Sequence, residues 1–481
     1  MTDTVCVIDI GTSSVRSARF HADGTLDAPV SRDTPPDTAA DGVSTFDPIA
    51  VRDAAVDTAT EVLRGGPVEG VGIAVQRAST VVWDPHTGLP LGPGLGWQDV
   101  RTVGRCLDLR AQGVHLAPNT TATKAEWLLD RLDPGQRARA LVGTIDAWLV
   151  WSLTRGAVHA TDATNAGVTG LFASGIWAPT ILETLRIRPE SLPRICDTVD
   201  TFGNAVALPD SPPIMAVIGD QQASMIGQGC VVPGRAKITF GTGGMLDLVG
   251  PPDLATSGAL TSTGCYPLIA WQEQGVPQVG VEAIMLAAGS HLTWLRDGLG
   301  LIETLEETDE LAASVDRTDG VSFVPALSGL GTPYWDHGAR GTLLGLTRGT
   351  TRAHVVRAVL EGIANLAVDL VEAAEAATGE TITELRVDGG MTRSDTFLRL
   401  VADAAQRPVV VSAEVEATAR GAGLLAGVGA GWYSSVVEAG SASAERATLA
   451  PDDGAAPDRD RWAEAVERAR NWIPELSALP F

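Results

Sequence analysis

The chain alternates short apolar runs with longer segments in which apolar residues recur at helical spacing. Apolar runs at 5–10 and 15–20, separated by a polar turn, predict two strands joined tightly. Further strands are expected at 71–75, 214–218, 236–240, 245–249 and 384–387. Asp47 before Pro48 is typical of a helix start, and this helix is expected to reach Leu63. Strands that alternate with helices indicate an α/β protein.

The same reading predicts the later elements. Helices are expected at 124–132, 351–377 and 394–406, and the polar, proline-rich stretch 31–42 is expected to be a surface loop. A stretch rich in alanine, proline and aspartate at 441–457 predicts a loose connector before a final helix at 458–473. Trp462, Ala469 and Trp472 would share one face of that helix.

One part of the pattern occurs twice. The run at 236–249 repeats the plan of 5–20: an apolar strand, a Gly-Thr turn with small residues, and a second apolar strand. In such a hairpin glycine permits a sharp turn, and small side chains let phosphate oxygens approach backbone N–H groups. A single turn of this kind is usually only a chain reversal. Two at corresponding places predict two similar halves that hold one polyphosphate between them.

A third glycine-rich turn contains Asp388, Gly389 and Gly390, between an expected strand and an expected helix. An adenine or a ribose can lie against glycine backbone at such a turn, although an ordinary strand-to-helix turn fits the same residues. The sequence has neither a GxGxxG that follows a strand and opens a helix nor a GxxxxGK[ST] loop. Nucleotide binding would therefore use the paired hairpins.

Composition narrows the class of protein. A length of 481 residues predicts two large domains, and no apolar run approaches the roughly 18 residues of a membrane span. The N-terminus has no basic region before its first apolar residues, so we expect a soluble, cytoplasmic protein. The net charge of −24 argues against nucleic-acid and anionic-membrane partners. Five scattered cysteines without a CxxC pair indicate free thiols.

Eight segments, in order, are similar to those of the FGGY carbohydrate kinases, and within that family to the glycerol kinases. They are IDIGTSSVR, GVGIAVQR, GLGWQDVRT, GTIDAWLVWSLTRGAVHATDATNAG, GDQQASMIGQ, FGTGG, VPALSGLGTPYWDHGARGTLLGLTRG and LRVDGGMTRSD. The resemblance implies two actin/Hsp70-type (ribonuclease H-like) α/β domains, 1–228 and 229–481, with a catalytic cleft between them. It also implies ATP and Mg²⁺ as cofactors and a small-molecule polyol or sugar as phosphoryl acceptor. A homodimer is one oligomeric state left open.

Asp220 follows the apolar run at 214–218. Phosphoryl transfer to an alcohol needs aligned reactants, charge stabilisation and a group that takes the hydroxyl proton. A carboxylate at the end of a buried strand suits the last task. The resemblance implies that Asp220 is this general base. The alternative role for the same residue is a helix N-cap.

The resemblance also implies the residues of the nucleotide side. Asp9, together with Asp220, is expected beside the Mg²⁺ ion. The expected nucleotide contacts are Thr12, Ser13, Ser14 and Arg16 in the first hairpin, Gly241 and Thr242 in the second, and Gly289, Gly389, Gly390 and Ser394. At position 394 a serine replaces the asparagine of the family.

The expected acceptor contacts are Arg77, Ala78, Trp97, Asn119, Asp220, Gln221 and Met245. Three of them depart from the glycerol kinases: Ala78 replaces a glutamate, Asn119 a tyrosine and Met245 a phenylalanine. Because smaller or more flexible side chains enlarge a pocket, we predict that the acceptor is a longer polyol, a ketose or another sugar. Glycerol itself, an actin-like ATPase or chaperone, and a catalytically silent sugar sensor stay open as alternatives.

Overall fold

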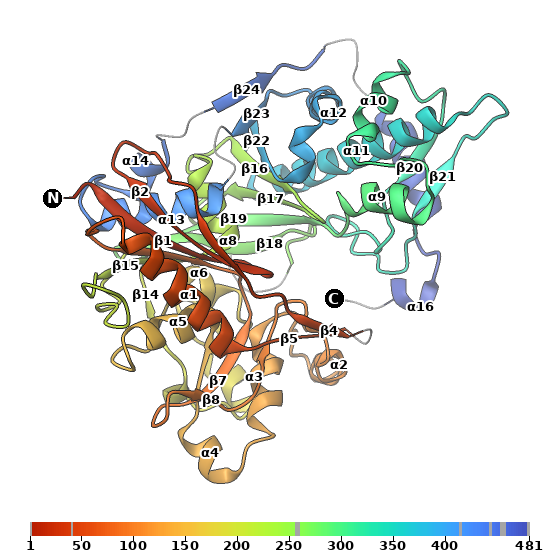
Figure 1. Cartoon of the computed structure of the whole chain (residues 1–481). Helices are drawn as coiled ribbons and strands as arrows, with labels where there is room; N and C mark the ends of the chain where they lie inside the picture. Colours follow the sequence, from red (N-terminus) through yellow and green to blue (C-terminus); the bar gives the residue numbers. More distant parts are fainter. Residues whose placement is uncertain are drawn as a thin grey trace.

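The computed structural model describes residues 2–39, 42–254, 260–412, 416–441, 445–452 and 458–478. Two large β-sheets dominate the molecule, and helices pack on both (Figure 1). The first sheet has the strand order β15-β6-β1-β2-β3. Its strands are β1 Thr4–Ile10, β2 Ser14–His21, β3 Val30–Asp33, β6 Val71–Val75 and β15 Ile214–Gly219. A tight turn makes β1 and β2 antiparallel, whereas β1 and β6, joined by a long crossover, are parallel.

The second sheet has the strand order β18-β19-β17-β16-β22-β23-β24. Its strands are β16 Arg235–Phe240, β17 Gly244–Val249, β18 Tyr266–Glu273, β19 Val276–Met285, β22 Glu384–Asp388, β23 Val409–Ser412 and β24 Glu445–Leu449. β16 is antiparallel to β17 and parallel to β22, which is the arrangement that β1 makes with β2 and β6. The predicted repeat of a strand-turn-strand unit is therefore confirmed.

The remaining elements are shorter strands and the helices. A smaller sheet contains β4 Asp37–Ala39, β5 Val43–Phe46, β7 Thr80–Asp84, β8 Leu89–Pro90, β9 Gly94–Leu95 and β10 Leu141–Thr144. Paired strands are β11 Ala160–Asp162 with β14 Arg194–Cys196, β12 Phe172–Ala173 with β13 Ile176–Trp177, and β20 Ser322–Val324 with β21 Thr342–Leu344. The helices up to Gly227 are α1 Pro48–Leu63, α2 Val103–Arg110, α3 Thr121–Leu129, α4 Pro134–Arg139, α5 Ile145–Leu153, α6 Ala163–Gly167, α7 Pro179–Thr184 and α8 Asp220–Gly227. The later helices are α9 Ser290–Thr293, α10 Glu307–Ala313, α11 Arg352–Thr378, α12 Asp395–Ala405, α13 Ala417–Gly429, α14 Val436–Ser441, α15 Arg459–Ala469 and α16 Pro474–Ser477.

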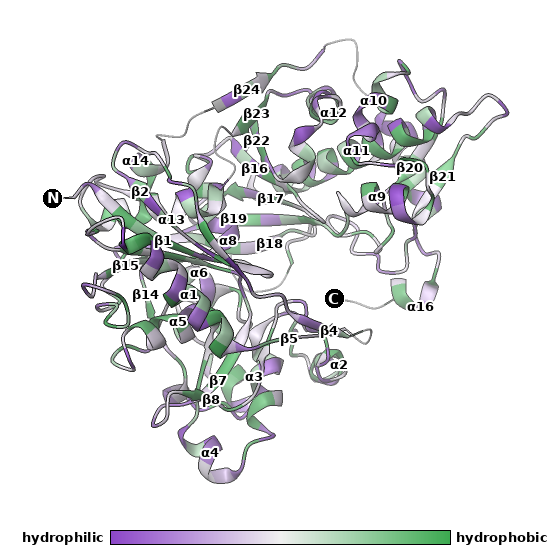
Figure 2. Cartoon of the chain, viewed as in Figure 1, coloured by the Kyte–Doolittle hydropathy of each residue, from purple (hydrophilic) through white to green (hydrophobic). Residues whose placement is uncertain are grey.

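Local sequence explains where the main helices begin. The carboxylate of Asp47 accepts a hydrogen bond from the N–H of Ile49 at 2.8 Å, so α1 begins at Pro48 as predicted. The hydroxyl of Ser394 accepts from the N–H of Phe397 at 3.0 Å and caps α12 in the same way. Hydrophobic residues follow the strands of both sheets (Figure 2).

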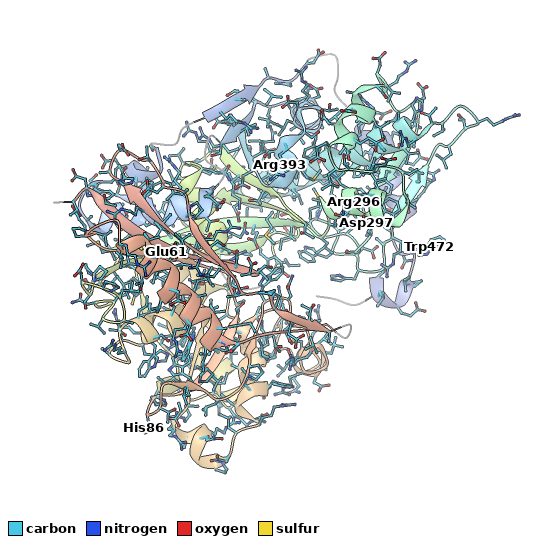
Figure 3. All side chains as sticks on the ribbon, viewed as in Figure 1. Glu61, His86, Arg296, Asp297, Arg393 and Trp472 are labelled. Carbon is cyan, nitrogen blue, oxygen red and sulfur yellow. The ribbon has the colours of Figure 1, made fainter. Side chains whose placement is uncertain are left out.

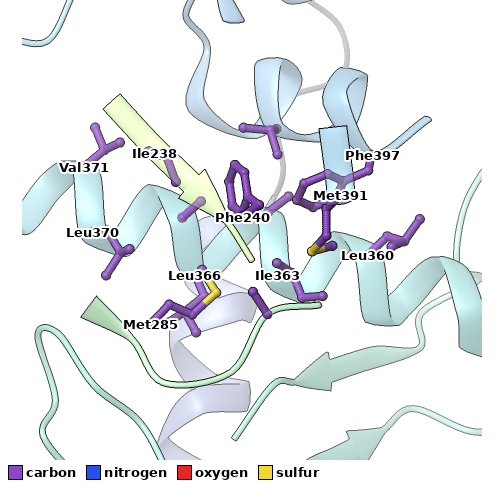
Figure 4. Close-up of a cluster of buried hydrophobic side chains, with 14 of the residues drawn as sticks. Ile238, Phe240, Met285, Leu360, Ile363, Leu366, Leu370, Val371, Met391 and Phe397 are labelled. Carbon is purple, nitrogen blue, oxygen red and sulfur yellow. The ribbon is translucent and has the colours of Figure 1, made fainter. Parts of the chain in front are cut away.

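In the half of the chain that contains the second sheet, the core lies between that sheet and the helices α11 and α12 (Figure 4). There the rings of Phe240 and Phe397 meet edge to face, with centroids 5.0 Å apart.

Helix α13 returns from the second half of the chain to the first sheet. It packs against β1, β6 and α8, and its apolar residues share a core with Val5 and Val7. The approach of α8 to α13 needs glycines: a Cβ on Gly421 would lie 1.9 Å from the carbonyl oxygen of Ala223, and one on Gly227 would lie 2.0 Å from that of Ala417. A late segment of the chain thus helps to build the first half, and the division at 228/229 stays a prediction.

Several sequence expectations need correction. The stretch 31–42, expected as a loop, contains the exposed strand β4 and most of β3. The expected connector 441–457 contains β24. Within these two stretches, residues 40–41, 442–444 and 453–457 lie outside the described part. These edge strands carry polar residues and lack an apolar run. The helix expected at 124–132 spans Thr121–Leu129. The last long helix ends at Ala469, so Trp472 is 70% exposed while Trp462 is buried (Figure 3).

Two expectations about composition can be checked as well. All five cysteines are free, as predicted, and all five are buried. Among the helices that the structure describes, none combines the length and the apolar character that crossing a membrane requires.

Candidate active site

Asp220 lies where the first sheet meets α8. Strand β15 ends at Gly219, and Asp220 is the first residue of α8. The N-cap is Gly219, so the alternative role of Asp220 as a helix cap is wrong. Its carboxylate accepts from the N–H of Gln221 at 2.8 Å and lies 3.6 Å from the Nε of Arg77. Burial raises the pKa of Asp220, and Arg77 opposes that rise. The side chain of Asp220 is 27% exposed.

Asp9 is the second carboxylate of this region. It lies near the end of β1, opposite Arg16 in the hairpin register. Burial raises its pKa to about 7, the charge of Asp220 adds to the rise, and Arg16 opposes it. A carboxylate that ionises less readily because a second one is near would be stabilised in its charged form by a hard divalent cation, whose charge offsets the repulsion.

The two predicted phosphate turns have the expected tight geometry. In the first, the N–H of Gly11 donates to the carbonyl of Ser14 at 3.0 Å, and in the second, that of Gly241 donates to the carbonyl of Gly243 at 2.9 Å. The hydroxyl of Thr12 accepts from the indole N–H of Trp97 at 3.0 Å. The first turn, expected on the nucleotide side, therefore lies directly beside an expected acceptor contact.

The other expected nucleotide residues gather at the second turn. The N–H of Gly289 donates to the carbonyl of Gly241 at 2.9 Å, and the N–H of Ala288 donates to that of Thr242 at 2.8 Å. Gly389 has φ +94°, and a Cβ there would lie 2.4 Å from the carbonyl oxygen of Phe240. Only glycine permits this approach, which brings the Gly389–Gly390 turn against the end of β16.

Two of the expected nucleotide contacts already bind other residues of the protein. The hydroxyl of Ser394 caps α12 and donates to Asp309 of α10 at 2.5 Å. Arg16 pairs with Glu416 at 2.7 Å, although its side chain is 41% exposed. The structure leaves the nucleotide roles of Ser394 and Arg16 as predictions.

The acceptor-side residues approach one another from both halves of the chain. Arg77 donates to Glu282 of β19 at 2.6 Å, and both side chains are largely buried. The side-chain oxygen of Gln221 accepts from Lys237 of β16 at 2.6 Å. Met245 is two residues before Asp247 in β17, so both side chains lie on the same face of that strand.

Lys124 brings together Ala78, Asn119 and the residue that precedes Trp97. The ammonium group of Lys124 donates to the backbone carbonyls of Ala78, Gly96 and Asn119 at 3.0, 2.9 and 3.0 Å. Ala78 itself has φ +58°, a left-handed conformation that is uncommon for alanine. The expected acceptor contacts therefore fall into two groups, one around Arg77 and Asp220 and one around Lys124.

Sequence reasoning missed a row of buried charges across the second sheet. Lys237, Asp247 and Glu282 are register neighbours on β16, β17 and β19, and they are 0%, 1% and 6% exposed. Lys237 pairs with Asp247 at 2.8 Å. In the sequence, each of these residues is a charge within a largely apolar strand, which is a signal for a buried ion pair. Only the register of the strands shows that the three charges are neighbours. The row gives Arg77 a second carboxylate, in addition to Asp220.

A further pair of contacts joins the halves at Asp388. Its carboxylate accepts from the hydroxyl of Ser224 at 3.0 Å and from the side-chain amide of Gln228 at 2.8 Å. Ser224 and Gln228 follow Asp220 on and just after α8. The candidate base and the expected adenosine turn are thus connected through one short helix.

Two similar halves, each with a sheet that contains the same strand-turn-strand unit, are the arrangement of ATP-dependent phosphotransferases of the actin/Hsp70 fold. Comparison with known proteins names the family: residues 4–227 match the N-terminal domain and residues 236–430 the C-terminal domain of the FGGY family of carbohydrate kinases. The chain belongs to that family, whose members phosphorylate a polyol or a sugar with ATP.

Individual relatives support this assignment. The chain is 40% identical to a glycerol kinase of Aromatoleum aromaticum, covering 97% of this chain and 98% of the relative. It is 37% identical to one of Gloeobacter violaceus, covering 98% and 97%. Among solved structures, a Plasmodium falciparum glycerol kinase with ADP superposes with a TM-score of 0.88 at 27% identity, covering 99% of each chain. A xylulose kinase of Lactobacillus acidophilus gives 0.87 at 20% identity, covering 98% and 99%, which supports the fold alone.

Proposed function

We propose that this chain transfers the γ-phosphoryl group of ATP to one hydroxyl of a polyol or ketose longer than glycerol, with Asp220 as the general base. The observation that carries the proposal is the half-buried carboxylate of Asp220 beside Arg77, at the meeting point of the two halves. Its raised pKa leaves it a better proton acceptor than an ordinary aspartate. Ala78 and Asn119 leave more room than the glutamate and tyrosine of glycerol kinases.

We assign the remaining roles from the resemblance to the family. Arg77, Trp97 and Gln221 would bind acceptor hydroxyls and orient one of them toward Asp220. The turns at Thr12 and Thr242 would bind phosphate oxygens through their backbone N–H groups.

The other ligands of the reaction would lie at the same meeting point. The Gly389–Gly390 turn would hold the adenosine. Asp9 and Asp220 would hold Mg²⁺, which neutralises charge on the transferred phosphoryl group when it is bound. A homodimer and a cytoplasmic location stay predictions.

Glycerol is the second candidate acceptor, and two observations favour it. Relatives at 37–40% identity are glycerol kinases. In addition, Glu282 provides Arg77 with a buried carboxylate partner at 2.6 Å, which partly replaces the glutamate missing at position 78. Under this alternative the enlarged pocket holds water beside glycerol.

An acceptor screen tests the proposal. ATP consumption is measured with glycerol, four- and five-carbon polyols and pentuloses, each against a blank without acceptor. We expect one longer acceptor to exceed glycerol in kcat/KM by about tenfold or more, because each well-placed contact is worth roughly that much discrimination. A preference for glycerol would replace the first candidate by the second. Hydrolysis that ignores the acceptor would indicate an actin-like ATPase, and ATP binding without turnover would indicate a sensor.

A further inference from the structure

The chain has only two lysines, Lys124 and Lys237, and both are fully buried. Lys237 has a carboxylate partner in Asp247. Lys124 is different, because no carboxylate of the described residues forms an ion pair with it, and its ammonium group is surrounded by backbone carbonyls. Burying a charge in this way is costly, and a neutral side chain of the same length would fill the space without that cost.

The three carbonyls belong to three separate segments. Ala78 precedes β7, Gly96 follows β9, and Asn119 precedes α3. Each segment carries an expected acceptor contact: Ala78 is preceded by Arg77, Gly96 is followed by Trp97, and Asn119 is one itself. An ammonium group has three N–H donors, one for each of these carbonyls.

The backbone of the first segment has an unusual conformation at the residue whose carbonyl Lys124 binds. Ala78 is held with φ +58°, which costs an alanine side chain energy. Its carbonyl accepts from Lys124 at 3.0 Å and from the hydroxyl of Thr121 at 3.3 Å. The bond from Lys124 therefore holds a strained residue that directly follows Arg77.

We propose that Lys124 is a positioning residue whose ammonium group holds the three acceptor-side segments together, so that acceptor recognition needs its charge and nucleotide binding does not. The proposal rests on the proposed acceptor site. Burial lowers the pKa of Lys124 to about 7, and buried Asp99 opposes the shift. The three carbonyl acceptors also favour the protonated form, since a neutral amine can donate to only two of them.

Kinetics of Lys124→Met test the proposal, with Leu128→Ala as the matched control. Methionine keeps the length of the side chain and removes the donors. Leu128 lies in the same helix and is buried, but it packs in the apolar core around Leu95 and Leu129. We expect Lys124→Met to raise the acceptor KM by about tenfold or more, the loss typical of a hydrogen bond to a charged group, with ATP KM unchanged. A similar rise for ATP and acceptor, or the same selective rise in Leu128→Ala, would overturn the proposal.

Chemical rescue separates the charge from the packing. Lys124→Ala leaves a space that n-propylammonium can enter, and we expect the added amine to lower the acceptor KM of this variant, whereas propanol at the same ionic strength does not. Rescue by both compounds, or by neither, contradicts a role for the charge.

Hydrogen exchange makes the test independent of the acceptor. In Lys124→Met we expect faster amide exchange at 76–80, 94–98 and 117–122, with β16 and β17 unchanged. If the wild-type protein phosphorylates none of the acceptors, the proposed function fails, and exchange still decides the role of Lys124. Unchanged exchange in all three segments would show that Lys124 does not hold them.

Discussion

The carboxylate of Asp220 is close to one guanidinium group and one backbone N–H, and this small set of contacts is compatible with a base. Asp220→Asn keeps the side-chain volume and the oxygen that accepts from Gln221. It cannot take a proton, so we expect kcat to fall by about 10²–10⁴-fold while the dissociation constant of ATP, measured without Mg²⁺, stays nearly unchanged. Steady-state kinetics and calorimetric titration with ATP check this. A variant that keeps more than about a tenth of the wild-type kcat would exclude the general-base role.

Under the proposed function, Ala78 and Asn119 would leave room for an acceptor longer than glycerol. Ala78→Glu with Asn119→Tyr restores the two side chains of the glycerol kinases. We expect glycerol kcat/KM to rise by about tenfold if one charged hydrogen bond is regained at about 1.5–3 kcal/mol, and turnover of the longer acceptor to fall because its space is filled. Initial rates with both acceptors measure this.

The single variants identify which residue acts. Asn119→Tyr alone should exclude the longer acceptor because the ring fills its space, with less gain for glycerol because no carboxylate is added. Ala78→Glu alone should gain less than the double variant, because its glutamate must adopt the left-handed backbone of Ala78 and compete with Glu282 for Arg77. Wild-type preference for glycerol over every longer acceptor, or an unchanged preference in the double variant, would contradict the enlarged pocket.

At the scale of elements, continuous apolar runs were predicted best. The strand at 71–75 has the predicted bounds, because all of its residues are buried and nothing polar interrupts them. β4 was missed because its side chains are exposed and polar, and its position depends on pairing with β5, which is not visible in its own residues.

The same limit applies to the site. Asp9, Asp220 and both phosphate turns follow from local sequence and resemblance. The partners Lys237, Asp247 and Glu282 could not be predicted, because cross-strand register brings them together from three strands. Lys124 was likewise hidden, since its hydrogen bonds go to backbone carbonyls, which no sequence pattern displays.

Helix α6 positions the end of β15. Its N-cap Asp162 accepts from the N–H and the hydroxyl of Thr164, and that hydroxyl accepts from the N–H of Gly219 at 2.9 Å. Thr164→Val keeps the shape and removes the acceptor, so a buried N–H next to Asp220 loses its partner. We expect a loss of about 1–3 kcal/mol in the free energy of unfolding, measured with urea, and a lower kcat. Thr164→Ser keeps the hydroxyl and should keep the wild-type stability and kcat. Equal losses of stability and kcat in the two variants would count against this hydrogen bond.

At the scale of the whole molecule, the candidate site has contributions from both halves. Arg77 in the first half pairs with Glu282 in the second, and Asp388 in the second accepts from Ser224 in the first. Helix α13 fixes the first half to the C-terminal part of the chain through close contact with α8. The halves are therefore connected near α8 and α13, and a relative motion of the two halves would have to change the contact between Arg77 and Glu282.

Closure of the two halves should accompany binding of both substrates. A kinase that binds ATP and acceptor on facing walls must exclude water, because ATP would otherwise be hydrolysed. We expect small-angle scattering to give a smaller radius of gyration with the acceptor and a non-hydrolysable ATP analogue together than with either alone. Compaction by the analogue alone would mean that closure does not depend on the acceptor. A radius that no ligand changes would contradict a hinged pair of halves and would assign the exclusion of water to loops at the site.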